Sequence, residues 1–212
     1  MNVNDKKILL VDDHSVVRKG IYLLIKKHFT NVTVSDVSSL KEAISVVHSE
    51  PIEFIVLDID FPEGNSLSFI EYILSTEKYN IKILIFTGLD ESIYAFKYLK
   101  AGASGFLRKF CEEDEIVNAL TKFFETGKYL SEDLKERLLD NMLRNHGESP
   151  TNILSLRELE VARLLAEGLS TNAISSKLNL QKSTVSTYKT RIFEKLGVEN
   201  VPALINFLKT NQ

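Results

Sequence analysis

Four short apolar runs in the first half of the chain each end at a side chain that can take part in chemistry. The runs KILLVDD, FIVLD, ILIFT and GFLRK end at Asp12 and Asp13, Asp58, Thr87 and Lys109. Short runs rich in Ile, Leu and Val, separated by amphipathic stretches of helical length, are typical of buried parallel strands. Ligands bind outside the carboxyl ends of such strands. We therefore expect these polar residues to meet at one edge of a sheet.

Three carboxylates gathered at one edge predict a bound cation. Two carboxylates about 4 Å apart repel each other by roughly 4 kcal/mol at an effective dielectric constant of 20. Mg²⁺ suits oxygen ligands and is usually held by one or two carboxylates together with a phosphate oxygen. An ammonium such as Lys109 and a hydroxyl such as Thr87 would stabilise the oxygens of a transferring phosphoryl group. A single Asp after a strand is typical of a helix cap or a turn, and Thr87 alone indicates nothing, but together these residues favour a phosphoryl-accepting site.

Strands and helices are expected to alternate strictly over about the first 125 residues. We expect strands near 6–11, 31–36, 53–58, 81–86 and 104–107, and helices near 14–28, 39–48, 66–75, 91–100 and 112–125. This alternation, without a long unstructured loop, predicts an α/β fold with a doubly wound, five-stranded parallel sheet and right-handed crossovers. A further short helix is expected over 131–145 with Ser131 as its cap, followed by a linker at 146–150 that contains Gly and Pro.

The last third of the chain has the pattern of four helices and no strand. Ser155 and Glu158 have the spacing of a capping box, which opens a first helix that ends near Glu167. The other helices are expected near 170–178, 182–196 and 200–209, with a short turn at 179–181. This pattern predicts a helix-turn-helix whose second helix enters the major groove of DNA. The expected core of this small all-α domain is Leu159, Ala162, Leu165, Ala173, Ile174, Leu178, Val185, Ile192 and Leu196.

Charge is distributed unevenly along the 212 residues. Residues 1–128 contain 15 Lys and Arg against 19 Asp and Glu, whereas residues 151–212 contain 8 against 5. The basic last third favours nucleic acid as a partner. The apolar runs are too short to span a bilayer and the N-terminus lacks a signal-peptide pattern, so we expect a cytoplasmic protein without a membrane partner. Cys111, the single cysteine, is expected to be a packing residue rather than a nucleophile.

The stretches LLVDDH, FIVLDIDFP, FTG and GASGFLRK resemble the receiver domain of the two-component response regulators, over about residues 5–127. The resemblance implies a flavodoxin-like receiver in which Asp58 accepts a phosphoryl group from a sensor histidine kinase. It also implies that Asp13 and Asp58 bind Mg²⁺ together with the backbone carbonyl of Asp60, and that Asp12 assists through water.

The same resemblance implies catalytic roles for Thr87 and Lys109 and a switch formed by Thr87 and Phe106. When Asp58 carries the phosphoryl group, Thr87 would move toward it and Phe106 would follow inward. The surface of the fourth and fifth helices and strands would then change. Phe106 stands where Tyr is common in the family, so this switch would be a packing change without a hydrogen bond.

The stretch LSLRELEVARLLAEGLSTNAISSKLNLQKSTVSTYKTRIFEKLGV resembles the LuxR-type helix-turn-helix, most closely that of the NarL/FixJ branch, over about residues 151–210. The expected DNA-binding residues are Lys182, Ser183, Thr184, Ser186, Thr187, Lys189, Thr190 and Arg191. The basic side chains are expected to contact phosphates, and Ser186, Thr187 and Thr190 to reach base edges. Family members often have Lys at the place of Ser186 and His at that of Tyr188, so the target DNA sequence does not follow from these residues.

The motifs together predict a receiver domain over 1–128, a linker helix and linker over 129–150, and a LuxR-type DNA-binding domain over 151–212. The predicted function is that of a DNA-binding response regulator. Phosphorylation of Asp58 would control dimerisation and promoter binding, and so transcription. Expected partners are a sensor histidine kinase, double-stranded promoter DNA, RNA polymerase and a second copy of the chain. Beyond self-phosphorylation and dephosphorylation, no enzyme activity is expected.

Two other functions stay open at the level of sequence. Asp58 and Asp60 also match the DxD motif of aspartate-nucleophile phosphohydrolases, although here an acidic pair precedes the motif and a DNA-binding pattern follows it. The second alternative is a constitutive DNA-binding protein whose receiver domain is silent. The apolar stripe on 200–209 either caps the helical core or forms a dimer contact. Tyr94 and Tyr98, one turn apart, either belong to a signalling surface or cover their helix.

Overall fold

The structure is a computed structural model that describes residues 6–62, 66–76, 80–143 and 153–210. The chain forms two compact units, Met1–Leu138 and Leu139–Gln212. The expected linker at 146–150 lies outside the described residues, and the expected domain limits at 128 and 151 stay predictions. Among the described residues, no helix is both long and apolar enough to cross a membrane.

The first unit is built on one sheet of five parallel strands in the order β2-β1-β3-β4-β5. The strands are β1 (Lys6–Val11), β2 (Val32–Val37), β3 (Phe54–Leu57), β4 (Lys82–Thr87) and β5 (Gly105–Arg108). The helices that follow them are α1 (Ser15–His28), α2 (Leu40–Ser49), α3 (Ser66–Ser75), α4 (Glu91–Lys100) and α5 (Glu113–Thr126), and α6 (Glu132–Leu143) begins in this unit and continues past its end at Leu138. This architecture confirms the predicted α/β fold. The strand order reverses at β1 and β3, which is where ligands bind in open parallel sheets.

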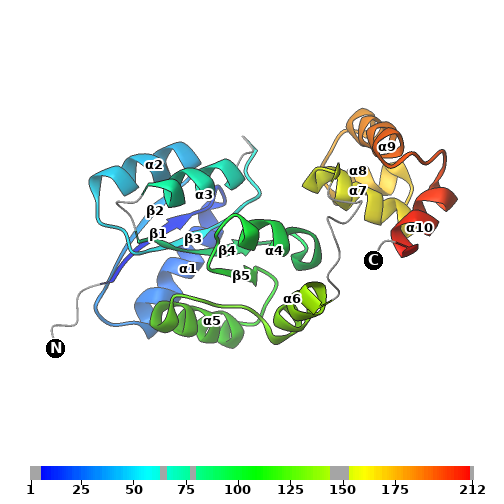
Figure 1. Ribbon diagram of the computed structural model, residues 1–212. Helices are drawn as coiled ribbons and strands as arrows, with labels where there is room; N and C mark the ends of the chain where they lie inside the picture. The colour runs from blue at the N-terminus through cyan, green and yellow to red at the C-terminus, as the bar shows by residue number, and fades with distance from the viewer. Residues whose placement is uncertain (1–5, 63–65, 77–79, 144–152, 211–212) are drawn as a thin grey trace. The chain divides into compact units, whose positions relative to one another are not determined.

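Apolar side chains fill both faces of the sheet, and helices cover each face. Figure 1 shows α1 and α5 on one face and α2 and α3 on the other. The core under α1 and α5 includes Ile8, Leu10, Ile21, Ile25, Phe54, Val56, Leu84, Phe86, Leu120 and Phe123. The alternate strand residues Leu9, Ile55, Leu57, Ile83 and Ile85 are fully buried as well. Because both faces of the central strands β1, β3 and β4 are covered, the polar side chains of these strands lie at the strand ends, whereas the edge strand β2 also carries Thr33, Ser35 and Asp36 along its length.

The two tyrosines of α4 point into the protein. Tyr94 is 3% exposed and Tyr98 is 4% exposed, so the alternative in which they form a signalling surface is wrong. The hydroxyl of Tyr98 lies 2.7 Å from the Oγ of Ser66, at the start of α3. α4 itself begins at Asp90, whose side chain accepts a hydrogen bond from the Ser92 N–H.

The beginning of α6 is bonded to the beginning of α4. Ser131 caps α6 as predicted, because its Oγ accepts a hydrogen bond from the Leu134 N–H at 3.2 Å. Arg137 Nη2 lies 2.7 Å from Glu91 Oε1, and the Ser131 hydroxyl donates to the same carboxylate. Burial raises the pKa of Glu91, although Arg137 and Ser131 oppose that rise. These contacts attach the first turns of α6 to the sheet unit.

The second unit contains α7 (Leu156–Ala166), α8 (Thr171–Lys177), α9 (Lys182–Leu196) and α10 (Val201–Thr210), with no strand among its described residues. The predicted capping box is present: the Ser155 Oγ accepts from the Glu158 N–H at 3.3 Å, and the Ser155 N–H donates to the Glu158 carboxylate at 2.7 Å. Between α8 and α9, Asn179 has φ of 51°, in the left-handed region that Asn tolerates well. The predicted helix-turn-helix is therefore confirmed.

The core of the second unit matches the expected one except at a few positions. It consists of Leu154, Val161, Ala162, Leu164, Leu165, Ile174, Val185, Ile192, Leu196, Leu204 and Leu208, with Leu159 and Leu178 packed against it. The prediction for Ala173 was wrong, because this residue is exposed on α8. Leu204 and Leu208 close the core from α10, which confirms the capping role of its apolar stripe.

Candidate functional site

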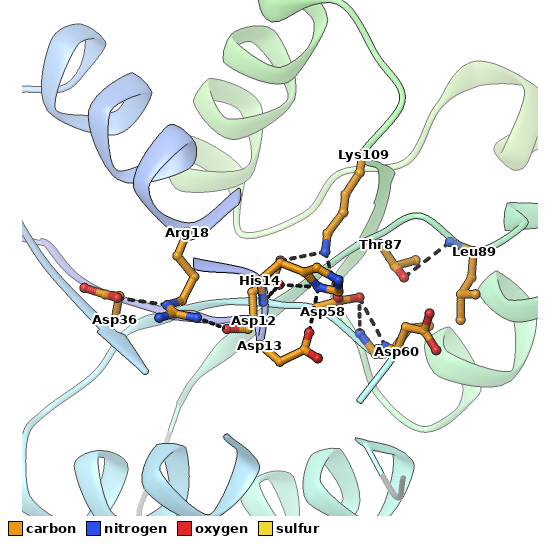
Figure 2. A network of polar contacts seen from close by, with 11 residues as sticks. Asp12, Asp13, His14, Arg18, Asp36, Asp58, Asp60, Thr87, Leu89 and Lys109 are labelled. Atoms are coloured by element: carbon orange, nitrogen blue, oxygen red, sulfur yellow. Dashed lines mark hydrogen bonds and ion pairs between the residues drawn. The ribbon is translucent and has the colours of Figure 1, made fainter. Parts of the chain in front are cut away.

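Lys109 binds two carboxylates at the carboxyl-end edge of the sheet. Its Nζ lies 2.6 Å from Asp12 Oδ2 and 2.6 Å from Asp58 Oδ2 (Figure 2). Asp12 follows β1, Asp58 follows β3 and Lys109 follows β5, so the lysine side chain reaches past β4 to the two acids. Asp12 is 5% exposed and Asp58 is 2% exposed. The structure thus joins three residues that the sequence predicted for one site.

The two acids keep Lys109 in its charged form. Burial by itself lowers the pKa of Lys109, because it disfavours the ammonium. The hydrogen bonds and negative charges of Asp12 and Asp58 outweigh that effect, and the pKa of Lys109 is raised above its ordinary value. The pocket therefore has a fixed positive charge at neutral pH.

The carboxylate of Asp58 is held in one orientation. Its Oδ1 accepts hydrogen bonds from the Ile59 N–H at 2.7 Å and the Asp60 N–H at 3.2 Å, and its Oδ2 contacts Lys109 (Figure 2). Both oxygens have fixed partners, so the group is oriented before a ligand arrives. Such preorganisation lowers the barrier of a displacement reaction at this carboxylate.

Asp13 brings a third carboxylate to this cluster. One ligand atom from each of Asp12, Asp13, His14 and Asp58 lies within 4.8 Å of the others. Asp13 Oδ1 lies 2.7 Å from His14 Nδ1, but the contact lacks hydrogen-bond geometry, and this buried oxygen has no hydrogen-bond partner among the described residues. An unpartnered oxygen among clustered carboxylates fits the preference of Mg²⁺ for oxygen ligands. Sequence reasoning missed His14, although it stands next to the acidic pair.

Arg18 of α1 holds the loop that carries the acidic pair. Its Nη1 donates to the backbone carbonyl of Asp12 at 2.5 Å, and its Nε donates to Asp36 Oδ2 at 3.0 Å (Figure 2). The guanidinium therefore connects α1, the end of β1 and the end of β2. Sequence reasoning missed this residue, because its partners are 6 and 18 residues away and no local pattern links them.

Thr87 and Phe106 lie on the adjacent strands β4 and β5, and both are fully buried. Thr87 Oγ1 accepts a hydrogen bond from the Leu89 N–H at 3.4 Å (Figure 2). The backbone carbonyl of Thr87 accepts from the Lys109 N–H at 2.8 Å. Because the Phe106 ring is already inside, its predicted inward movement would have to start from another conformation. The switch stays a prediction.

A second functional surface lies on α9, which presents a polar face opposite the buried Val185 and Ile192. Of the eight predicted DNA-binding residues, the exposed ones are Lys182, Ser183, Ser186, Thr187, Thr190 and Arg191, and the half-buried ones are Thr184 and Lys189. A helix with one buried and one polar face suits insertion into the major groove, where the polar face meets base edges and phosphates.

Contacts within α9 limit the freedom of three of these side chains. The Thr187 hydroxyl donates to the carbonyl of Ser183 at 2.9 Å, and the Thr190 hydroxyl donates to that of Ser186 at 3.2 Å. Both hydroxyls can accept a hydrogen bond as they stand, but must rotate to donate one. Lys189 Nζ lies 5.5 Å from the centre of the Phe193 ring, which accounts for its partial burial.

Lys195, a further basic residue near the end of α9, has a structural partner in the second unit. Its Nζ lies 2.7 Å from Glu158 Oε2. Burial alone raises the pKa of Glu158, but the bonds from Lys195 and from the Ser155 cap outweigh it and hold this pKa below its ordinary value. The ion pair joins α7 to the end of α9, so the Lys195 ammonium is paired within the second unit.

Comparisons with known proteins cover both units. The response regulator receiver domain family matches residues 8–121, and the luxR family of bacterial regulatory proteins matches residues 152–208. The chain belongs to the two-component response regulators. This regulator is 32% identical to the nitrate/nitrite response regulator protein homolog of Haemophilus influenzae over 97% of its own length and 98% of that protein. It is 28% identical to the oxygen regulatory protein NreC of Staphylococcus carnosus over 95% of each chain.

The regulator also resembles solved structures of RcsB. A structure of two RcsB dimers bound to two parallel DNAs aligns with a TM-score of 0.58 and 26% identity over 99% of this chain and 100% of that chain. RcsB from Salmonella enterica serovar Typhimurium, bound to promoter P1flhDC in the presence of phosphomimetic BeF3-, aligns with the same TM-score, identity and coverage. The regulator is therefore a DNA-binding protein of the NarL/FixJ type, with a receiver domain and a LuxR-type helix-turn-helix.

The two family matches contain both functional surfaces of the regulator. The receiver match, 8–121, includes every residue of the carboxylate pocket, and the luxR match, 152–208, includes the whole polar face of α9. The roles of the individual residues in these surfaces stay predictions.

Proposed function

We propose that Asp58 of this response regulator accepts a phosphoryl group from a sensor histidine kinase, and that the resulting acyl phosphate controls dimerisation and promoter binding. The observation that carries this proposal is the contact of Lys109 Nζ with both Asp12 and Asp58. An ammonium held between two acids at the edge of a sheet adds nothing to a hydrophobic core. It is, however, the charge that a transferring phosphoryl group needs beside it.

In the transfer, a carboxylate oxygen of Asp58 forms a P–O bond while the P–N bond of the donor phosphohistidine breaks. The electron pair of that bond returns to the imidazole, which takes up a proton. Lys109 neutralises one phosphoryl oxygen, and the Thr87 hydroxyl, whose oxygen accepts from the Leu89 N–H, can donate its hydrogen to another. The reaction needs little more from the protein than position and charge.

Asp12, Asp13 and Asp58, together with the backbone carbonyl of Asp60, would hold Mg²⁺. The unpartnered Asp13 Oδ1 and the 4.8 Å clustering of the side chains support this set. When bound, the ion neutralises phosphoryl oxygens during transfer. Asp12 keeps its contact with Lys109, so it shares in the charge balance on the side of the pocket where β1 ends.

The exposed face of α9 would read promoter DNA. Its cations hold phosphates and its hydroxyls reach base edges. The description of an RcsB structure as dimers bound to DNA supports a dimer as the active form here, and two linked helix-turn-helix units bind more tightly than one. Promoter DNA as the partner supports a cytoplasmic location, with RNA polymerase as a further partner.

The two other functions are less well supported. A phosphohydrolase has no use for a LuxR-type domain, which the family match shows here. A silent receiver would not need the full set of Asp12, Asp13, Asp58, Thr87 and Lys109, all of which lie at the same strand edge.

The decisive test compares the wild type with Asp58→Ala after incubation with Mg²⁺ and acetyl phosphate. Intact mass, oligomeric state and affinity for promoter DNA are measured for each protein, and Asp114→Asn, on the exposed start of α5, serves as a control. We expect one phosphoryl adduct, a dimer and tighter DNA binding in the wild type and the control, and none of these in Asp58→Ala. Equal DNA binding by all three proteins, with or without the phosphodonor, would establish the silent receiver instead.

A further inference from the structure

A chain of buried hydrogen bonds runs from the phosphoacceptor loop to α4. The Ser66 hydroxyl donates to the backbone carbonyl of Ile59 at 3.2 Å, and the Tyr98 hydroxyl lies 2.7 Å from the same Ser66 oxygen. Ser66 is 3% exposed, Tyr98 4% and Ile59 6%. Because a serine hydroxyl has a single hydrogen, and Ser66 gives it to Ile59, the Tyr98 hydroxyl must be the donor to Ser66.

The acceptor of this chain belongs to the peptide group that faces Asp58. The Ile59 carbonyl and the Asp60 N–H are the two sides of one peptide bond, and a trans peptide points them in opposite directions. On one side, the Asp60 N–H donates to Asp58 Oδ1 at 3.2 Å (Figure 2). On the other side, the carbonyl is held by Ser66 and Tyr98. This peptide therefore cannot turn toward or away from Asp58 without disturbing α3 and α4.

We infer that Ser66 and Tyr98 are positioning residues that set this peptide and couple the state of Asp58 to α4. The inference rests on the proposed phosphorylation of Asp58. A phosphoryl group on Asp58 provides new oxygen acceptors for the Asp60 N–H, and the peptide turns to meet them. The Ile59 carbonyl then moves, and the hydrogen bonds that join it to Ser66 and Ser66 to Tyr98 carry this displacement to α4. α4 begins at Glu91, four residues after Thr87, and Tyr98 lies near its other end, so the signal would reach both ends of the helix.

Burial makes each hydrogen bond of this chain costly to lose. A hydrogen-bonded chain away from water is polarised along its length, and removing one member leaves the next without a partner. A hydroxyl lost from Tyr98 or from Ser66 should therefore loosen the same peptide to a similar extent. Removing both hydroxyls should loosen the peptide little more than removing one, because the two hydrogen bonds act in series. Such non-additivity distinguishes a chain from two unrelated packing contacts.

The experiment uses the full chain as wild type, Tyr98→Phe, Ser66→Ala and the double variant. Tyr72→Phe is the matched control, because it removes a different tyrosine hydroxyl, on α3, that lies 3.0 Å from His48 Nε2 at an exposed position. Hydrogen exchange is measured at the Asp60 amide and along α4, with and without acetyl phosphate and Mg²⁺. Intact mass reports the adduct, and DNA affinity is measured in parallel.

We expect both single variants to form the adduct as the wild type does, while exchange of the Asp60 amide becomes about fivefold faster. The phosphorylation-induced change in α4 exchange, and the gain in DNA affinity, should fall about fivefold in each single variant and no further in the double one. Tyr72→Phe should behave as the wild type.

The inference is overturned if Tyr98→Phe and Ser66→Ala form the adduct and keep the wild-type change in α4. If Tyr98→Phe disturbs the packing of α4, Ser66→Ala tests the coupling instead, because this variant leaves Tyr98 unchanged. If the wild type itself takes up no phosphoryl group, the proposed function fails and the coupling with it. The Asp60 exchange rates without phosphodonor then still show whether Tyr98 positions the peptide.

Discussion

Removing the charge of Asp13 should stabilise the first unit when Mg²⁺ is absent. The ligand oxygens of Asp13, Asp12 and Asp58 lie within 4.8 Å of one another. At that distance each pair of carboxylates repels by about 3.5 kcal/mol at an effective dielectric constant of 20. Lys109 contacts Asp12 and Asp58, and one ammonium offsets only part of the repulsion on Asp13. Asp13→Asn should therefore raise the free energy of unfolding of this unit by about 1–3 kcal/mol.

In saturating Mg²⁺ the wild type should be more stable than Asp13→Asn. An ion at a hundred times its dissociation constant adds about 2.7 kcal/mol to the stability of a protein that binds it only when folded. Asp13→Asn removes a ligand, so most of that gain should disappear from the variant. The assay is hydrogen exchange of the most protected sheet amides, which reports the unfolding of this unit, in EDTA and in saturating Mg²⁺.

Asp114→Asn is the control, because it removes an exposed carboxylate of the same unit; since Asp114 lies in the first turn of α5, this change should lower stability by less than about 1 kcal/mol, opposite in sign to the effect of Asp13→Asn. The reasoning is refuted if Asp13→Asn is no more stable than the wild type in EDTA and gains as much from Mg²⁺. That result would mean that the pocket is already balanced by its own cations and needs no metal ion.

Two further outcomes concern the second unit. Arg191→Gln should weaken binding to all DNA sequences alike and lower the slope of log affinity against log salt concentration by about one. The control Lys209→Gln, on α10, should change neither the affinity nor the slope. DNA titrations at several salt concentrations check this, and a change in sequence preference would show instead that Arg191 contacts bases. The pKa of Glu158 is held low, since Lys195 outweighs burial, so its charge stabilises the fold above the unfolded pKa and this contribution disappears as pH falls through the folded pKa. Glu158→Gln should lower the protection of α7 amides by about 1 kcal/mol at pH 7 and by less near pH 4; an equal loss at both pH values would contradict the ion pair.

The sequence by itself determined the parts of this regulator that depend on neighbouring residues. Buried strands appear as apolar runs, and Asp12, Asp58 and Lys109 mark their ends, so a parallel sheet had to bring them to one edge. The capping box at Ser155 and the left-handed turn at Asn179 are equally local. These features follow from period, length and turn chemistry, which the chain carries before it folds.

Only the tertiary structure decided which way a helix turns its faces and which distant groups meet. Tyr98 is on an amphipathic helix, but its inward direction depends on how α4 packs against α3, and Ala173 faces outward for the same kind of reason. Arg18 finds its partners, and Glu91 finds Arg137, across elements whose relative position no local spacing encodes. The pocket could be predicted because strand ends share an edge by topology; its supports could not, because they depend on packing between elements.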